Sequence, residues 1–225
     1  MKRVDKLSEF RAQRLQLLAL GFAHPTPELH RLLVSGDYSL ALAQTGARLE
    51  LPSVKEASFE DFEAAYIQLF QVGKRGRPQV SLNAADHAEV FDGGDRPQFL
   101  LGYSAWYRHF GLKTAEGEGA NELPDHLLCQ LEFLCWLAHL QSVNDTDTGY
   151  ALAQRDFCRR HLAQFLESLI TALQSGESTA TRKFYLALAV LALETVDELL
   201  EDYRNLGTPL AVSTEEKTDV VNLWG

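Results

Sequence analysis

The chain has 225 residues, 46% of them hydrophobic, which is enough for one sizeable domain with a buried core and leaves little room for two. Its formal net charge of −10 at pH 7 argues against general nucleic-acid binding, because a phosphate backbone would be repelled, and it favours a cationic partner. The longest uninterrupted apolar run, residues 184–193, is about half as long as a membrane span requires, and residues 1–15 lack the apolar core of a signal peptide.

Apolar residues recur with a helical period in nearly every segment, and no segment shows the alternation typical of a strand. The first predicted helix covers residues 5–22 and ends before Pro25. A short helix near residues 27–34 follows. Asp37 is then placed to cap a third helix, which we expect to run to about residue 50.

The middle of the chain contains two predicted helices separated by a long connection. Ser58 and Asp61 have the spacing of a capping box, which predicts a helix over residues 58–70. Glycine and proline mark residues 72–97 as a connection. The helix expected after it, residues 98–110, is rich in aromatic side chains.

A loop over residues 114–123 leads into the most apolar helix of the chain, which we predict over residues 124–141. Pro124 suits its first turn, and its apolar side chains cover nearly the whole circumference. A helix that is apolar on all sides is a central, buried one. Two long helices, residues 149–174 and 178–203, complete the pattern.

We therefore predict a single all-α domain, a helical bundle over residues 1–208, followed by a loosely ordered tail over residues 209–225. The three cysteines are an odd number, and none forms a C-x-x-C pair. Their apolar helical surroundings predict reduced core thiols and a cytoplasmic location. They are Cys129, Cys135 and Cys158.

A metal site is the alternative that the residues leave open. Glu132, Cys135 and His139 are three and four residues apart, so one helical face could present all three to a metal ion. A fourth ligand could come from Cys158 or His161 on the next helix. Because the chain lacks both H-E-x-x-H and E-x-x-H, we favour a buried thiol with an interfacial histidine, and we predict no cofactor.

Asp125 and His126 lie at the start of the central helix. Asp125 could accept backbone N–H bonds as a helix cap, and His126 could simply be exposed. Taken alone, the two residues are typical of a cap.

Three segments together resemble the TorD/DmsD/NarJ family of redox-enzyme maturation chaperones, in order and in spacing. The motif ELPDHL…LEFL is similar to the NarJ branch, and within it to the chaperones encoded with dimethyl-sulfide, ethylbenzene, selenate and chlorate molybdoenzymes. The segments are YIQLFQVGKRGRPQVSLNAADH (66–87), FLLGYSAWYRHFGLK (99–113) and NELPDHLLCQLEFLCWLA (121–138).

The resemblance implies an all-helical cytoplasmic chaperone without catalytic turnover. Its partner would be the catalytic subunit of a molybdenum enzyme of the DMSO reductase type, bound through its N-terminal region, often a twin-arginine signal peptide. The chaperone would hold that subunit until the molybdenum cofactor is inserted. We expect a monomer, although the connection over residues 72–97 would allow two chains to exchange helices.

The family's motifs fall on specific residues of this chain. The E-x-x-D-H pattern corresponds to Glu122, Asp125 and His126, with Pro124 in its usual place, and the following acidic helix position to Glu132. The Y-x-x-L-F pattern corresponds to Tyr66, Leu69 and Phe70.

The chemistry of such a peptide agrees with these residues. Arginines followed by an apolar segment call for carboxylates beside an apolar groove. Residues 114–126 contain four acidic residues and no Lys or Arg. Exposed ion pairs contribute only about 0.2–1 kcal/mol each, so the groove must supply most of the affinity. We expect its apolar lining to be Tyr66, Leu69, Phe70, Trp106 and Tyr107.

Overall fold

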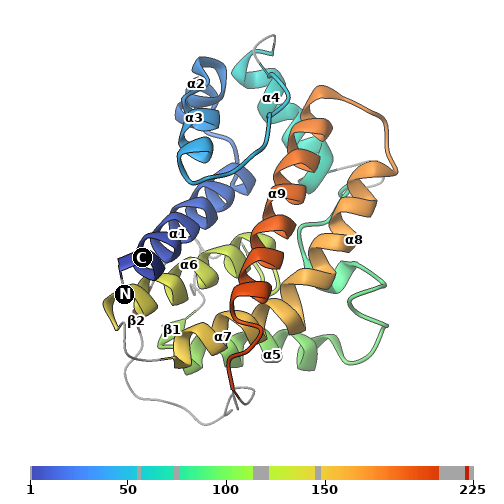
Figure 1. Cartoon of the computed structure of the whole chain (residues 1–225). Helices are drawn as coiled ribbons and strands as arrows, with labels where there is room; N and C mark the ends of the chain where they lie inside the picture. Colours follow the sequence, from blue (N-terminus) through green and yellow to red (C-terminus); the bar gives the residue numbers. More distant parts are fainter. Residues whose placement is uncertain are drawn as a thin grey trace.

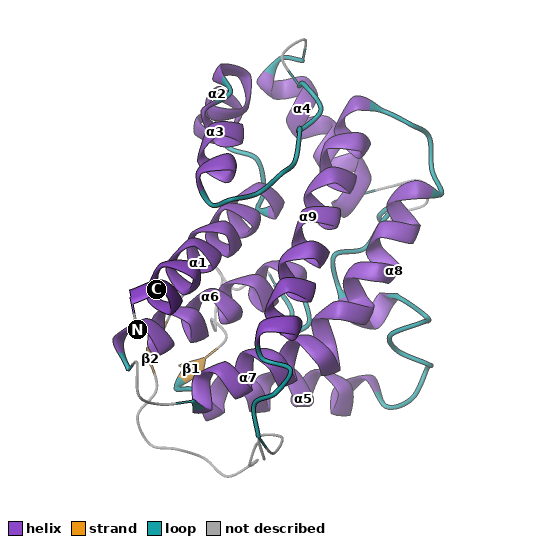
Figure 2. Cartoon of the chain, in the orientation of Figure 1, coloured by secondary structure: helices purple, strands orange, loops and turns teal. Residues whose placement is uncertain are grey.

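The computed structural model describes residues 2–54, 57–72, 77–113, 122–144, 148–207 and 221–222. Helices joined by loops make up nearly all of these residues, which confirms the predicted all-α class (Figures 1 and 2). The α-helices are α1 (Lys2–Phe22), α2 (Pro27–Ser35), α3 (Asp37–Gln44), α4 (Phe59–Tyr66), α5 (Arg96–His109), α6 (Leu127–Val143), α7 (Gly149–Phe157), α8 (Ala163–Gln174) and α9 (Ala180–Asp202).

Two glycines set the bounds of α3, and both bounds differ from the prediction. Gly36, with φ 87°, is the N-cap, so Asp37 is the first helical residue and not the cap. The carboxylate of Asp37 instead accepts a hydrogen bond from Ser35 Oγ at 2.7 Å. The helix ends at Gln44, earlier than expected, because Gly46 takes a left-handed conformation with φ 83°.

Two long predicted helices each contain a π-helical turn. Ser58 is the N-cap of α4, as the predicted capping box requires, since its Oγ accepts from the Asp61 N–H at 3.1 Å. This helix then continues through a π-helical turn at Ile67–Gln71. Likewise α7 and α8 form the single helix predicted for residues 149–174, with a π-helical turn at Cys158–Leu162 between them.

The central position predicted for the apolar helix is confirmed. Helix α6 contacts both α1 and α7 (Figure 1). Four of its leucines are buried: Leu127, Leu131, Leu134 and Leu137. Leu131 and Leu134 are fully buried. Most of its apolar side chains belong to one hydrophobic cluster, which extends from Leu15 in α1 to Leu199 in α9.

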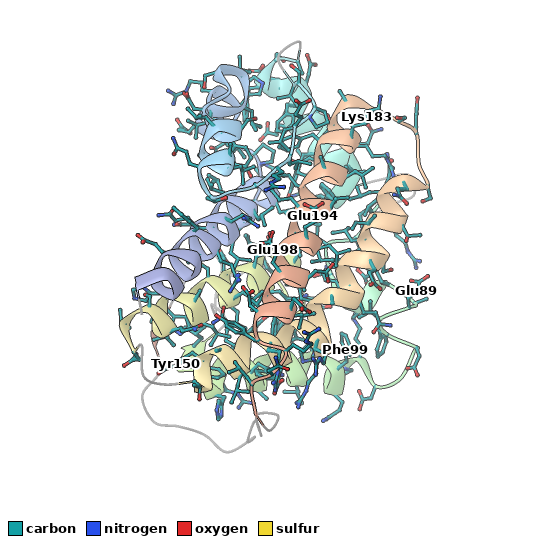
Figure 3. All side chains as sticks on the ribbon, viewed as in Figure 1. Glu89, Phe99, Tyr150, Lys183, Glu194 and Glu198 are labelled. Carbon is teal, nitrogen blue, oxygen red and sulfur yellow. The ribbon has the colours of Figure 1, made fainter. Side chains whose placement is uncertain are left out.

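Buried arginines connect the helices around this core. Arg14 of α1 donates to Glu198 of α9 at 2.8 Å and to the Thr45 carbonyl at 2.8 Å. Figure 3 shows Glu198 on the side of α9 that faces α1. Arg182 of α9 donates to the carbonyls of Ala172 and Leu173 at the end of α8, where positive charge is favoured.

The described strands are two residues long. Leu112–Lys113 pairs in parallel with Val221–Asn222, so two residues of the predicted tail are placed. The rest of residues 209–225, most of the loop 114–123 and residues 73–76 of the predicted connection lie outside the described residues. No helix in the described part of the chain is both long and apolar enough to cross a membrane.

The central helix gives a stability prediction. Leu131→Ala or Leu134→Ala should each lower the free energy of unfolding by about 2–5 kcal/mol, because either change leaves a cavity in a packed core. Urea unfolding would measure this. Val143→Ala at the end of the same helix is the control, since Val143 is 62% exposed and should cost little. A loss below about 1 kcal/mol at both leucines would contradict a central position for α6.

Candidate functional site

An ordered segment, residues 79–91, runs from the end of the α4 helix past the start of α6 to α8; we call it the strap. Its beginning is held by the Val80 N–H, which donates to the Leu69 carbonyl at 2.9 Å. Its middle pairs with the start of α6, where the Leu127 N–H donates to the Leu82 carbonyl at 2.8 Å. The sequence indicated only a connection here.

Asp125 joins the strap to α6. Its side chain accepts from the Ala85 N–H at 2.8 Å, and its carbonyl accepts from the Ala84 N–H at 3.2 Å and from the Gln130 side chain at 2.8 Å. Asp125 is fully buried, and its Oδ1 atom has no hydrogen-bond partner among the described residues. Burial raises the pKa of this carboxyl, and the hydrogen bond from Ala85 partly offsets the rise.

The helix therefore begins later than predicted, and Asp125 is not its cap. The first helical residue is Leu127, and His126 is the N-cap, with Nδ1 accepting from the Leu128 N–H at 3.2 Å. The alternative of an exposed His126 is also wrong, because the ring is buried. The physical reason is that the oxygens of Asp125 bind the strap, so the neighbouring ring takes over the free helix amide.

His126 also contacts an acidic side chain. Its Nε2 lies 3.5 Å from Glu122 Oε2. Burial lowers the pKa of His126 to about 4, so the ring is neutral at pH 7 and the contact is between a neutral N–H group and a carboxylate. The neutral form agrees with the cap, in which Nδ1 must accept a hydrogen bond.

Glu122 and Glu132 form an acidic pair beside this cap. The Glu122 side chain is 43% exposed, whereas Glu132 is half-buried, and its Oε2 atom has no hydrogen-bond partner within the described ranges. Burial first, and the charge of Glu122 second, raise the pKa of Glu132 to about 8. Glu132 is therefore mostly protonated at pH 7, and a cation bound nearby would favour its ionisation.

The aromatic residues expected to line an open groove are buried instead. The Tyr66 hydroxyl donates to the Phe22 carbonyl at 3.0 Å, and the Tyr107 hydroxyl donates to the Pro124 carbonyl at 2.6 Å. Trp106 packs edge-on against Phe157. The tyrosine hydroxyls find their hydrogen-bond partners inside the protein, and the rings pack against other rings, so these side chains belong to the core. Those buried are Tyr66, Leu69, Phe70, Trp106 and Tyr107.

The structure nevertheless brings several of these residues to the acidic pair. Glu122 is close enough to Tyr66 to raise its pKa, after the larger effect of burial, and Glu132 is one of the charges near Tyr107. Pro124 lies against Tyr107 through the hydroxyl bond. Trp106 contacts Phe157 and so faces the α7 helix instead.

The alternative metal site is not assembled in the described ranges, where no three His, Cys, Asp or Glu side chains are placed to hold a metal ion. The Cys135 thiol points to the Ala12 carbonyl at 3.7 Å, and His139 stacks on Trp136. Cys158 is fully buried, and burial raises the pKa of its thiol, which agrees with the prediction of a core cysteine.

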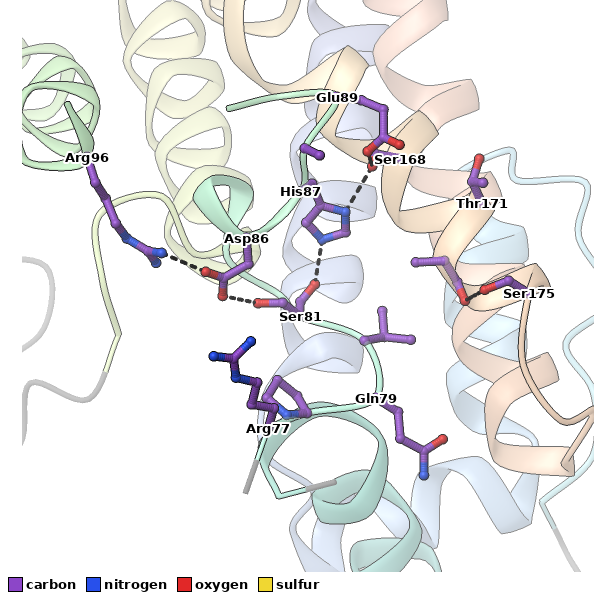
Figure 4. Close-up of a pocket in the computed structure, with 14 residues that line it drawn as sticks. Arg77, Gln79, Ser81, Asp86, His87, Glu89, Arg96, Ser168, Thr171 and Ser175 are labelled. Atoms are coloured by element: carbon purple, nitrogen blue, oxygen red, sulfur yellow. Dashed lines mark hydrogen bonds and ion pairs between the residues drawn. The ribbon is translucent and has the colours of Figure 1, made fainter. Parts of the chain in front are cut away.

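Sequence reasoning missed a polar cleft of about 690 Å³ on the other side of the strap (Figure 4). One wall is the strap and the residues before it. The other is the face of α8 that carries Ser168 and Thr171, together with Ser175, the C-cap of that helix. Asp86 bonds both Arg96 and Ser81, at 2.8 and 2.6 Å. The polar residues Ser81, Asp86 and His87 inside a predicted connection were the signal that could have indicated it.

The chain matches the family model described as nitrate reductase delta subunit over residues 17–171. It is 37% identical over 168 residues to the dimethyl sulfide dehydrogenase assembly chaperone protein of Rhodovulum sulfidophilum. The aligned region covers 71% of this chain and 67% of that protein. It is 32% identical over 218 residues to the perchlorate reductase assembly chaperone protein of Dechloromonas aromatica. The aligned region covers 90% of this chain and 93% of that protein. No solved structure matches the chain.

The hydrogen bond from Ala85 to Asp125 gives a second stability prediction. Asp125→Ala should lower the free energy of unfolding by about 1–3 kcal/mol, because the buried Ala85 N–H loses its acceptor. Asp125→Asn keeps an oxygen at that position and should cost less, as urea unfolding of both variants would show. Equal losses for the two variants would mean that the acceptor does not matter.

The protonation of Glu132 gives a pH prediction. An acid whose pKa rises on folding stabilises the protein fully below its unfolded pKa of about 4.3, and this contribution is lost as the pH rises toward about 8. Glu132→Gln should therefore raise the melting temperature relative to wild type more at pH 8.5 than at pH 5. Glu167→Gln, on an exposed part of α8, is the control. A gain that is the same at both pH values would exclude a protonated Glu132.

Proposed function

Because the chain belongs to the nitrate reductase delta subunit family, we propose that it is an assembly chaperone for the catalytic subunit of a molybdenum enzyme. The observation that carries the proposal is the similarity to the perchlorate reductase assembly chaperone protein, which extends over 90% of this chain. Relatives with dimethyl sulfide dehydrogenase and chlorate reductase in their names support the same class. The chaperone would act in the cytoplasm and would hold its client until the cofactor is inserted.

The client segment in this proposal is the N-terminal region of the catalytic subunit, with two arginines followed by an apolar stretch. The guanidinium groups would bind beside Glu122, which is exposed, and Glu132, whose Oε2 atom lacks a hydrogen-bond partner among the described residues. Binding of a cation there would ionise Glu132, so the client would gain a charge partner that the free protein keeps protonated.

The remaining residues of the proposed site act mainly as support for this surface. Asp125 and His126 fix the start of α6, and Pro124 accepts the Tyr107 hydroxyl. The apolar residues expected to bind the client are buried in this arrangement, so direct contact with a peptide requires the side chains that cover them to move. Those residues are Tyr66, Leu69, Phe70, Trp106 and Tyr107.

The close pair Ser168 and His87 does not favour a hydrolase as a second function. In a catalytic dyad the histidine must accept the serine proton. Here Ser168 Oγ donates to Glu89 at 2.9 Å, and the opposite ring nitrogen of His87 is held by a backbone carbonyl. The serine therefore offers no proton to the ring, so this pair is not a catalytic dyad.

Titration calorimetry with a synthetic peptide, two arginines followed by an apolar segment, tests the proposed site. Glu122→Gln should weaken binding by about 1.4-fold to fivefold, because an exposed ion pair contributes about 0.2–1 kcal/mol. Replacing both arginines of the peptide with glutamine should weaken it at least as much. Glu28→Gln on α2 is the matched control, since Glu28 is also an exposed acid.

Two outcomes would contradict the proposal. Equal affinities of the Glu122→Gln and Glu28→Gln variants for the peptide would remove the acidic pair from the site. The chaperone function itself is tested by producing the catalytic subunit from the same gene neighbourhood with and without this chain. An equal and full content of cofactor in both samples would rule it out.

A further inference from the structure

One large apolar side chain is exposed next to the acidic pair. Leu123 is 43% exposed, and it directly follows Glu122, whose side chain is also 43% exposed. The other large apolar side chains exposed in the described part of the chain belong to α1, α2, α3, α5, the end of α6 and the residue after the π-helical turn that follows α4. A single exposed leucine is ordinary, so its meaning depends on what surrounds it.

A β-turn fixes the position of Leu123. The His126 N–H donates to the Leu123 carbonyl at 2.9 Å, and Pro124 occupies the second position of the turn, where its ring restricts the backbone. The turn is anchored on both sides, because the Pro124 carbonyl accepts from the buried Tyr107 hydroxyl at 2.6 Å and Asp125 is bound to the strap. Leu123 is therefore presented by a preorganised backbone, which lowers the entropic cost of a contact there.

The same turn places the carboxylate of Glu122. His126 closes the turn, and its Nε2 lies 3.5 Å from Glu122 Oε2. Because consecutive α-carbons are only about 3.8 Å apart, the carboxylate and the leucine side chain start from neighbouring points of one backbone. A ligand that pairs with Glu122 thus brings the residues next to its charge within reach of Leu123.

Leu123 differs in accessibility from the aromatic residues that the sequence indicated. Tyr66 and Phe70 are only 3% and 6% exposed, so a peptide reaches them only after other side chains have moved. Contact with Leu123 removes apolar surface from water in the structure as it stands. The first apolar contact of a client at this site is therefore available at Leu123.

We propose, on the basis of the chaperone function proposed above, that Leu123 determines specificity at this site, and that the site selects clients in which an apolar side chain follows the arginines within about three residues. An extended peptide advances by about 3.3–3.6 Å per residue, so an apolar residue farther along lies beyond a leucine that adjoins Glu122. Charge complementarity identifies the occupant, because the carboxylates beside Leu123 favour a cationic segment over a purely apolar one.

Titration calorimetry with two peptides of the same composition tests this spacing rule. In the first peptide, two arginines are followed directly by leucines and then by four serines; in the second, the four serines separate the arginines from the leucines. Wild type should bind the first peptide more tightly. Leu123→Ser should weaken binding of the first peptide about threefold to ninefold, because the 43% of the leucine surface that is exposed would no longer be buried by the ligand, and should leave binding of the second unchanged.

Two further variants separate a contact with the ligand from an effect on the fold. Leu123→Met offers a similar apolar area and should bind the first peptide nearly as tightly as wild type. Leu40→Ser is the matched control, because Leu40 is 58% exposed on α3, a helix that packs on α1 and α2, and both peptides should bind it as they bind wild type. Serine is favoured at the first position of a β-turn, so Leu123→Ser should keep the melting temperature of wild type.

A Leu123→Ser variant that binds the first peptide as tightly as wild type would overturn the role of Leu123. So would an equal loss of affinity for both peptides, because the spacing would then have no effect. Glu122→Gln, measured alongside, separates the two proposals: if it weakens binding while Leu123→Ser does not, the client site stands and the specificity rule fails. Binding of neither peptide by wild type would overturn both.

Discussion

The backbone N–H groups of Ala84 and Ala85 and the side chain of Gln130 all donate to the oxygens of Asp125, inside the protein and away from water. Buried polar groups that lose their partners are costly, so these bonds allow only one path for the chain. They oblige the strap to run beside α6 and delay the start of that helix to Leu127. The acidic pair, the histidine cap and the polar cleft all take their places from this arrangement.

The acidic region next to Asp125 carries less charge than its composition indicates. Burial raises the carboxyl pKa of Asp125, of Glu132 and of Glu122. A protein with a net charge of −10 thus keeps part of its negative charge neutralised by protons where the client is proposed to bind. Such a surface repels itself less when empty and gains charge at Glu132 when a cation arrives, which favours a cationic peptide over a neutral one.

Periodicity was sufficient to predict the helices and the central place of α6, because packing a helix with apolar residues on all sides leaves one solution. It could not predict the N-cap at His126, since that depends on the strap, whose Ala85 lies 40 residues before Asp125. Nor could it decide whether the side chains of Tyr66 and Tyr107 line a groove or lie in the core. An aromatic residue at helical spacing suits either, and only the carbonyl groups of Phe22 and Pro124 decide it.

The π-helical turn at Cys158–Leu162 holds one residue more than the α-helical turn that it replaces. Each residue advances an α-helix by about 100°, so this single insertion sets the rotational phase of all of α8 relative to α7. A homologous chain without the extra residue would turn the position of Ser168 away from the strap. Among related proteins, those that keep the extra residue should therefore also keep the facing pair His87 and Ser168. Those that have lost it should have lost the pair as well.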